Sequence, residues 1–248
     1  MSIFSGFKKN RGLPRCSAVI AAAGSSTRMD GEDKLFAELC GVPVLAHTLR
    51  AFQESPPVDE IIVVVRGEML ERAAELCRTY GIDKAGTVIA GGESRISSVY
   101  NGVLAASDKA GLIAIHDGAR PCVDLRVIED AIKAAAKLHA ATPAVPLSST
   151  VKRVSNGVVT ETVSRGDLYE IQTPQVFDAD LIKAALTKAL KIGSEPGAAM
   201  EFTDDCMAVE SIGFPVHITE GSRNNIKLTT REDMAIAEAF LGKPMPSL

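Results

Sequence analysis

A run of small residues follows the first strongly apolar segment of the chain, and two cations come soon after it. The run spans residues 22–27 (AAGSST), and the cations are Arg28 and Lys34. Small side chains let backbone N–H groups approach phosphate oxygens closely. Arg binds such oxygens as a fixed fork, and Lys acts as a mobile point charge. The combination predicts a phosphate-binding loop, although a tight turn with two solvated charges would show the same residues.

The run does not match the better-known nucleotide-binding signatures. It lacks the GxxxxGK[ST] pattern of a P-loop and the three glycines of a dinucleotide fingerprint. Elsewhere, none of the four histidines has metal-ligand spacing to another, and no GxSxG elbow occurs. These absences disfavour a P-loop ATPase, a dehydrogenase, a zinc enzyme and a Ser-His-Asp hydrolase.

Two later segments place polar residues directly after expected strands. They are GGESR at residues 91–95 and HDGARP at residues 116–121. A carboxylate in such a loop suits Mg²⁺, which combines one or two carboxylates with substrate phosphates. Asp117 is therefore the candidate metal ligand. The alternative is a turn residue, since Asp-Gly is ordinary turn chemistry.

Apolar runs of strand length alternate with amphipathic segments and must position these loops. We expect strands at residues 17–23, 61–65, 87–90 and 112–115, and helices at about 43–53, 69–80, 96–103 and 125–138. Strands that read as buried on both faces are typical of a parallel sheet. Right-handed crossovers then place helices on both faces, and ligands bind beyond the carboxyl ends of the strands.

The pattern changes after Pro146. Residues 151–154 and 158–163 alternate apolar and polar side chains around Asn156-Gly157, the strongest short signal for a hairpin. We expect a projecting β-arm over about residues 148–172. The helix and strand rhythm resumes with helices near 179–190 and 205–212, strands at 216–219 and 226–228, and a helix at 232–241.

These elements predict an α/β fold with a single Rossmann-like, mostly parallel sheet, helices on both faces and an inserted β-arm. We expect one domain over residues 1–248, with residues 1–14 as an extension. The apolar Val151, Val158 and Val163 of the arm need burial. A partner subunit could supply it, or the arm could fold back on its own domain.

Composition excludes several classes of protein. The chain has 248 residues and a net charge of −4, with neither the bias of a disordered chain nor a Lys/Arg block. Its longest apolar stretches, at residues 16–23 and 61–65, are far shorter than the ~20 residues of a membrane span. Five cysteines without a CxxC pair argue against a disulfide framework or zinc site and favour the cytoplasm. Few aromatic residues and the absence of a basic block disfavour a nucleic-acid polymer or membrane partner.

The motifs occur in one order: AAG, Arg28-Met29, Lys34, GGESR, HDGARP, TVKR, TPQ and NIK. In this order they resemble the motifs of polyol-phosphate cytidylyltransferases over about residues 16–241. They are most similar to those of the enzymes that act on 2-C-methyl-D-erythritol 4-phosphate in the non-mevalonate pathway. The resemblance implies transfer of CMP from CTP to the substrate phosphate, release of pyrophosphate, and use of Mg²⁺.

Two alternatives remain open. Ribitol-5-phosphate cytidylyltransferases share most of the same motifs, so ribitol phosphate is the alternative acceptor. A catalytically silent nucleotide-binding module could keep the same fold, since fold alone does not imply function. Retention of Arg28, Lys34 and Asp117 argues against such a module.

The resemblance also implies roles for the residues that bind the nucleotide. Arg28 and Lys34 would be catalytic and stabilise the pentavalent transition state. The remaining nucleotide-binding positions would be Ala23, Gly24, Gly92, Glu93 and Ser98.

A second set would hold the acceptor. The substrate-binding positions would be Asp117, which also lies by Mg²⁺, and Thr150, Arg165, Thr173 and Lys227, while Arg120 supports the Asp117 loop. Without the resemblance these residues read as strand-face threonines, a solvated arm charge and an edge-strand lysine. The resemblance further implies a homodimer with crossed arms, in which Thr150 and Arg165 complete the partner's site.

Four positions depart from the family's usual pattern. Ser26 stands in place of a glycine and is small enough to keep the backbone cradle. Asp33-Lys34-Leu35 replaces Pro-Lys-Gln, which removes a polar side chain near the nucleotide loop. Asn224 replaces an aspartate and argues against a second metal carboxylate there.

Overall fold

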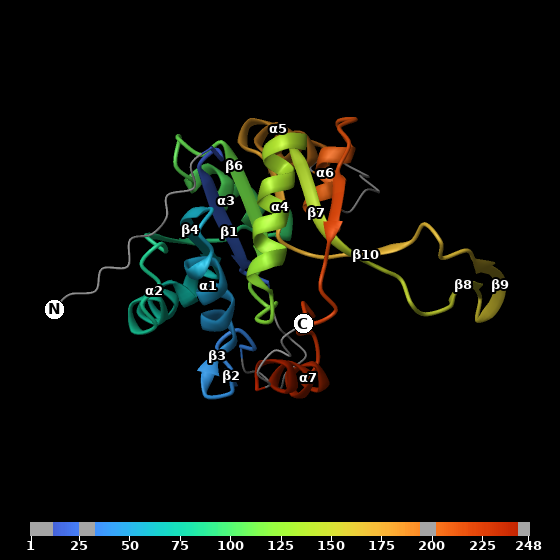
Figure 1. The fold of residues 1–248 in the computed structure, drawn as a ribbon, viewed down its shortest axis with the longest axis horizontal. Helices are drawn as coiled ribbons and strands as arrows, with labels where there is room; N and C mark the ends of the chain where they lie inside the picture. Colours follow the sequence, from blue (N-terminus) through green and yellow to red (C-terminus); the bar gives the residue numbers. More distant parts are fainter. Residues whose placement is uncertain (1–11, 25–32, 194–201, 243–248) are drawn as a thin grey trace.

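The computed structural model describes residues 12–24, 33–193 and 202–242. Its centre is an eight-stranded sheet in the order β10-β7-β11-β6-β1-β4-β5, with β12 also paired to β7 (Figure 1). The strands are β1 (Cys16–Ala22), β4 (Val58–Val65), β5 (Thr87–Ala90), β6 (Leu112–Asp117), β7 (Ala140–Pro146), β10 (Tyr169–Ile171), β11 (Gln175–Asp178) and β12 (His217–Glu220). Two small separate pairs are β2 (Glu38–Leu39) with β3 (Val42–Pro43), and β8 (Val151–Ser155) with β9 (Val158–Val163).

Helices cover both faces of the sheet. They are α1 (Val44–Glu54), α2 (Leu70–Thr79), α3 (Arg95–Ala105), α4 (Leu125–Leu138), α5 (Ala179–Gly193), α6 (Asp205–Glu210) and α7 (Arg231–Leu241), with a 3-10 turn η1 (Gly67–Met69). Apolar side chains of α1, α2 and α4 pack in one core, and those of α3, α5 and α6 pack in another. Strand β1 alternates between them, with Ile20 in the first core and Val19 in the second. The predicted α/β layering is confirmed.

The parallel half of the sheet forms where β-branched runs are buried on both sides. Strand β1 pairs in parallel with both β4 and β6, and β4 pairs in parallel with β5. Residues Ile61 to Val65 of β4 are almost completely buried. Because all four strands run the same way, their carboxyl ends meet at one edge, and the loops with the candidate motifs meet there too.

In the other half of the sheet, the strand expected at residues 216–219 is confirmed as β12, but β7, β10 and β11 were not predicted. Strand β11 is antiparallel to both β6 and β7, and β10 is antiparallel to β7. Two prolines and three alanines in β7 weaken its strand signal, since both residue types are depleted in strands. The expected strand at residues 226–228 is wrong: this segment pairs with no strand, and Leu228 N donates to the carbonyl of Ala119 in the loop after β6.

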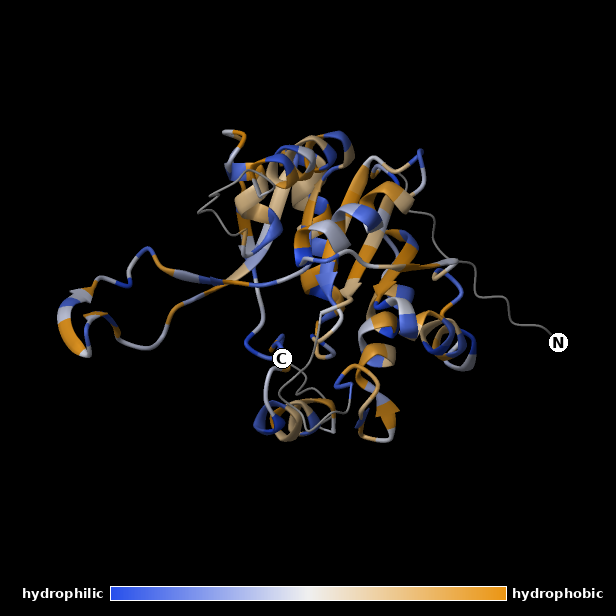
Figure 2. Cartoon of the chain, turned by 180° about the vertical axis from the view of Figure 1, so that it is seen from behind, coloured by the Kyte–Doolittle hydropathy of each residue, from blue (hydrophilic) through white to orange (hydrophobic). Residues whose placement is uncertain are grey.

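The β-arm projects from the body of the molecule, with the β8–β9 hairpin at its tip (Figure 1). Asn156 and Gly157 have φ values of +50° and +78°, which the predicted turn requires. In Figure 2, orange segments mark apolar residues along the tip, where Val158 is 65% exposed. The arm therefore does not fold back on its own domain (Figure 1).

Among the helices of the described residues, none combines the length and apolar character that crossing a membrane requires. All five cysteines lie in the described part of the chain and are free thiols.

Candidate active site

A cleft of about 550 Å³ opens at the carboxyl ends of β1, β4, β5 and β6, and we call it the active-site cleft. The expected site residues that line it are Ala23, Gly24, Lys34, Gly92, Glu93, Ser98, Asp117 and Lys227. They come from four segments that are far apart in sequence. The topology therefore brings together most of the predicted nucleotide site, part of the acceptor site and the candidate metal ligand.

One wall of the cleft is built by glycines that face the start of α3. Gly92 N donates to Ser98 Oγ at 3.0 Å, and Ser98 Oγ donates to the carbonyl of Ser94 at 2.8 Å. Ser94 caps α3 in a reciprocal box with Ser97. A Cβ at Gly91 would lie 2.5 Å from Ala23 Cβ and 2.6 Å from Ser98 Oγ. Only glycine allows this wall to lie against the β1 loop.

We expect Gly91→Ala to raise the KM for the nucleotide about tenfold, since relieving an overpacked contact costs ~1–3 kcal/mol and would move Ala23 or Ser98. Gly86→Ala is the matched control, because a Cβ at Gly86 meets nothing within 4 Å. Steady-state kinetics and the melting temperature of both variants check this. A Gly91→Ala enzyme with the wild-type KM would show that the close approach does not shape the nucleotide site.

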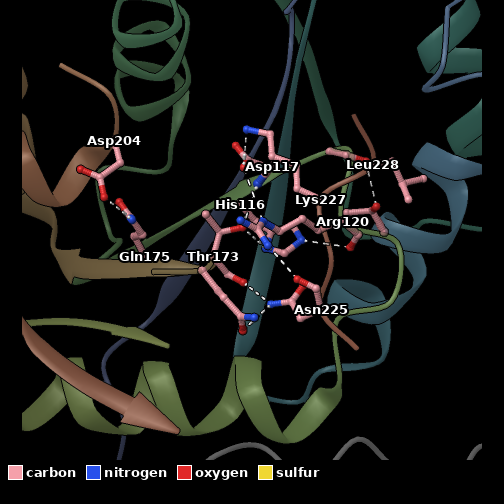
Figure 3. Close-up of polar contacts among 12 residues, drawn as sticks. His116, Asp117, Arg120, Thr173, Gln175, Asp204, Asn225, Lys227 and Leu228 are labelled. Carbon is pink, nitrogen blue, oxygen red and sulfur yellow. Dashed lines mark hydrogen bonds and ion pairs between the residues drawn. The ribbon is translucent and has the colours of Figure 1, made fainter. Parts of the chain in front are cut away.

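Asp117 is the electrostatic centre of the cleft. Its Oδ2 lies 2.9 Å from Lys227 Nζ and 3.6 Å from Arg120 Nε (Figure 3). Its Oδ1 lies 3.6 Å from Arg95 Nη2. Burial alone would raise the pKa of the Asp117 carboxyl, but the charges of Lys227, Arg95 and Arg120 outweigh it and hold this pKa well below its ordinary value. The carboxylate is therefore ionised at neutral pH.

Buried polar groups behind Asp117 fix its position. Thr173 Oγ1 accepts from Asp117 N at 3.2 Å and lies 2.9 Å from His116 Nδ1 (Figure 3). Burial lowers the pKa of His116 to about 3, so the ring is neutral. Its Nε2 lies 3.3 Å from the carbonyl of Arg120 and donates to it, which leaves Nδ1 to accept from the threonine hydroxyl. Asn225 Nδ2 donates to the carbonyl of Thr173, and Arg120 Nη1 donates to that of Asn225. Thr173 is 4% exposed and lies behind the cleft lining, beside Asp117.

The other expected acceptor residues lie in different places. Thr150 and Arg165 are exposed at the base of the hairpin, away from the cleft of their own chain, and Arg165 donates to the carbonyl of Ser148. Lys227 lies outside any strand, so its interpretation as an edge-strand lysine is wrong. Arg28 falls outside the described residues.

Two cations in the cleft were not assigned from the sequence. Arg95 pairs bidentately with Asp205, with Nη1–Oδ1 and Nη2–Oδ2 distances of 3.0 and 2.7 Å. Gln175 Oε1 accepts from the backbone N of Asp205 and of Cys206, which ties α6 to β11. Arg66 at the end of β4 is the second cation. Arg95 and Gln175 lie within GGESR and TPQ, but nothing local in the sequence indicates their partners.

The described residues hold no preformed metal cage, since they contain no group of three or more His, Cys, Asp or Glu side chains able to bind an ion. Asp117 is an ionised carboxylate that lines the cleft, which Glu93 also lines. That arrangement fits Mg²⁺ held by one carboxylate together with substrate phosphates.

Comparison with known proteins adds a consistent result. Residues 16–243 match the sequence model of the IspD family, 2-C-methyl-D-erythritol 4-phosphate cytidylyltransferase. The chain is 44% identical over 230 residues to the protein of that name from Dehalococcoides mccartyi strain 195, covering 92% of this chain and 97% of the relative. It is 43% identical to the protein of that name from Halalkalibacterium halodurans, with the same two coverages. The crystal structure of 4-diphosphocytidyl-2C-methyl-D-erythritol synthase from Anaerococcus prevotii is similar, with a TM-score of 0.80, 31% identity, and coverage of 93% of this chain and 97% of the other.

Proposed function

The chain belongs to the 2-C-methyl-D-erythritol 4-phosphate cytidylyltransferase family, and on that premise we propose how its active-site cleft works. The enzyme transfers CMP from CTP to 2-C-methyl-D-erythritol 4-phosphate and releases pyrophosphate. The product is 4-diphosphocytidyl-2-C-methyl-D-erythritol, an intermediate of the non-mevalonate isoprenoid pathway. The observation that carries this function is the match over nearly the whole chain, joined to a cationic cleft at the strand ends.

An oxygen of the acceptor phosphate attacks the α-phosphorus of CTP in line. The bond from that phosphorus to the bridging oxygen of the β-phosphate breaks, and pyrophosphate leaves. Such a transfer needs positioning and electrostatic stabilisation and no protein nucleophile. The Ala23-Gly24 backbone and Lys34 line the cleft where the triphosphate would lie. Lys34, with Arg28 beside it in sequence, would stabilise the charge that develops in the transition state.

The nucleotide base would lie against the glycine wall. Gly92, Glu93 and Ser98 line that side of the cleft, and Ser98 Oγ is held by Gly92 N and the Ser94 carbonyl. The close approach of Gly91 to Ala23 leaves little room there. This crowding favours a pyrimidine over a larger purine.

Mg²⁺ would be held by Asp117 and the substrate phosphates, and when bound it would neutralise part of the triphosphate charge. Asp117 already stands in ion pairs with Lys227 and Arg95. These cations orient the carboxylate, and Lys227, whose side chain is 43% exposed, can also reach an acceptor phosphate. Thr173 would act from behind by fixing the backbone of Asp117.

We place Thr150 and Arg165 in the partner's acceptor site, in a homodimer formed through the β-arm. The arm projects away from its own cleft and carries exposed apolar side chains at its tip, including Val154, Val158 and Val159. An isolated two-stranded hairpin is marginally stable in water, so a second subunit that buries it would stabilise it. Five free thiols suit the reducing cytoplasm, where we place the enzyme.

Mixing inactive chains tests the crossed-arm dimer. Arg28→Ala and Arg165→Ala chains are combined under subunit exchange, and we expect roughly a quarter of wild-type activity to return. Half of the dimers are then hybrids, and each hybrid has one intact site and one doubly damaged site. Each variant allowed to exchange with itself is the control. If mixing restores nothing while exchange is demonstrated, Arg28 and Arg165 act within one chain and the shared site is excluded.

The proposed activity is tested by pyrophosphate release with Mg²⁺, each of the four nucleoside triphosphates, and methylerythritol phosphate or ribitol phosphate. We expect CTP with methylerythritol phosphate to give the highest kcat/KM. A higher kcat/KM with ribitol phosphate would show that ribitol phosphate, and not methylerythritol phosphate, is the acceptor. If no combination released pyrophosphate, the chain would be a catalytically silent nucleotide-binding module.

A further inference from the structure

The turn that carries Lys34 is attached to the sheet by an ion pair to which the proposed function assigns no role. Asp33 Oδ2 lies 2.5 Å from Arg66 Nη2. Arg66 directly follows β4, whose last five residues are almost completely buried. The side chain of Asp33 is only 10% exposed. The pair therefore joins the residue before Lys34 to a rigid central strand.

Asp33 also organises the turn around Lys34. Its Oδ1 accepts from Leu35 N at 3.0 Å, and its carbonyl accepts from Phe36 N and Ala37 N at 2.9 and 3.1 Å. The side chains of Leu35 and Phe36 then enter the core. One residue thus sets both the shape of the turn and its attachment.

The direction of Lys34 follows from this anchorage. With the chain fixed on both sides of it, the Lys34 side chain reaches across the active-site cleft, where Nζ donates to the carbonyl of Leu228 at 3.0 Å. Leu228 in turn is bonded to Ala119, next to the Asp117 loop. Lys34 is thereby held against the segment that carries Lys227, and both lysines line the active-site cleft.

The charge of Asp33 explains why an arginine faces it. A lone carboxylate at Asp33 would repel the phosphates that Lys34 attracts. Arg66 neutralises it at 2.5 Å and itself lines the cleft. The other carboxylate on Arg66, Glu68 at 3.2 Å, is 65% exposed and points to the surface, so it shares little of this task.

We propose that Asp33 and Arg66 are positioning residues, and that their ion pair fixes the turn that presents Lys34 to the triphosphate. The inference rests on the proposed role of Lys34 in the transfer of CMP. Asp33 and Leu35 stand where the family usually has proline and glutamine. In this chain the Asp33–Arg66 ion pair and the bond from Leu35 N to Asp33 anchor the turn.

Asp33→Asn, Lys34→Ala and the double variant test the proposal. Asparagine keeps an acceptor for Leu35 N and loses the charged oxygen that accepts from Arg66. We expect Asp33→Asn to lower kcat about tenfold, because small displacements of a group at the reaction centre are costly. In the Lys34→Ala background, the same change should alter kcat by less than about twofold, since Asp33 acts through Lys34.

Glu68→Gln is the matched control, because it removes the other carboxylate from Arg66 without touching the turn. We expect its kcat and its KM for CTP to equal those of wild type. Arg66→Met should lower kcat and raise the KM for CTP, since it leaves the Asp33 carboxylate unpaired beside the substrate. Adding Asp33→Asn to Arg66→Met should bring the KM back toward wild type.

The outcomes distinguish the positioning role of Asp33 and Arg66 from the catalytic role of Lys34. Wild-type kcat in Asp33→Asn, or a full tenfold loss in the Lys34→Ala background, overturns the positioning role while leaving the role of Lys34 intact. Wild-type kcat in Lys34→Ala itself overturns the proposed role of Lys34 and the positioning with it. A KM that stays raised in the Asp33→Asn/Arg66→Met double variant would show that Arg66 binds the nucleotide directly.

Discussion

Lys34→Ala is expected to lower kcat by about 10² or more and to leave the melting temperature unchanged. The variant removes a cation held in advance at the place where negative charge develops, and losing one such group commonly has an effect of this size. Lys34 lines the open cleft, and its Nζ bonds to the backbone carbonyl of Leu228, so its removal opens no closed apolar cavity. Stopped-time assays of pyrophosphate release at saturating CTP and acceptor measure the effect.

Lys133→Ala is the control for this experiment. Lys133 is a half-exposed lysine of α4 that pairs with Glu129, away from the cleft. Its kcat should match that of wild type. If Lys34→Ala also turned over at the wild-type rate, Lys34 would be an ordinary surface charge and the proposed stabilisation of the transition state would be wrong.

Asp117→Asn is expected to lower kcat by about 10², with only partial recovery as Mg²⁺ is raised. Asparagine keeps the size of the side chain and removes the charge that would share Mg²⁺ with the substrate phosphates. It also leaves Lys227 and Arg95 without the carboxylate that now lies 2.9 and 3.6 Å from them. The second effect does not depend on the metal, which is why excess Mg²⁺ cannot restore the full rate.

Titrations of activity against Mg²⁺ check this result for Asp117→Asn and for Asp130→Asn, an exposed aspartate of α4. The control should follow the wild-type curve. An unchanged half-saturating Mg²⁺ concentration in Asp117→Asn would count against Asp117 as the metal carboxylate. It would leave only its ion pairs to explain any loss of rate.

The parallel half of the fold could be predicted because its strands are short β-branched runs between helices of clear period. The predicted segments at residues 87–90 and 125–138 coincide with β5 and α4. Strands β7, β10 and β11 were not predicted, because their residues lack that signal and form strands through pairing with their neighbours. The sequence of residues 226–228 has the pattern of a strand, but the segment forms none. It places Lys227 beside Asp117, with Nζ 2.9 Å from Oδ2.

The site could be predicted to the extent that it lies at strand ends. Motif residues such as Gly92 and Asp117 follow β5 and β6, and parallel strands bring those loops together. The partners of Arg95 and Arg66 could not be predicted, since Asp205 lies 110 residues from Arg95, and Asp33 lies 33 residues from Arg66. Such pairs follow from tertiary packing and leave no periodic or local trace in the sequence.

The most direct test of the account is phosphorus NMR of CTP and 2-C-methyl-D-erythritol 4-phosphate incubated with the enzyme and Mg²⁺. We expect the acceptor phosphate and the α-phosphate of CTP to give way to two coupled diphosphate resonances, with one pyrophosphate formed for each product. Neither product should form when the acceptor is left out. Release of orthophosphate, formation of pyrophosphate without the acceptor, or an unchanged spectrum would contradict the transfer of CMP in this cleft.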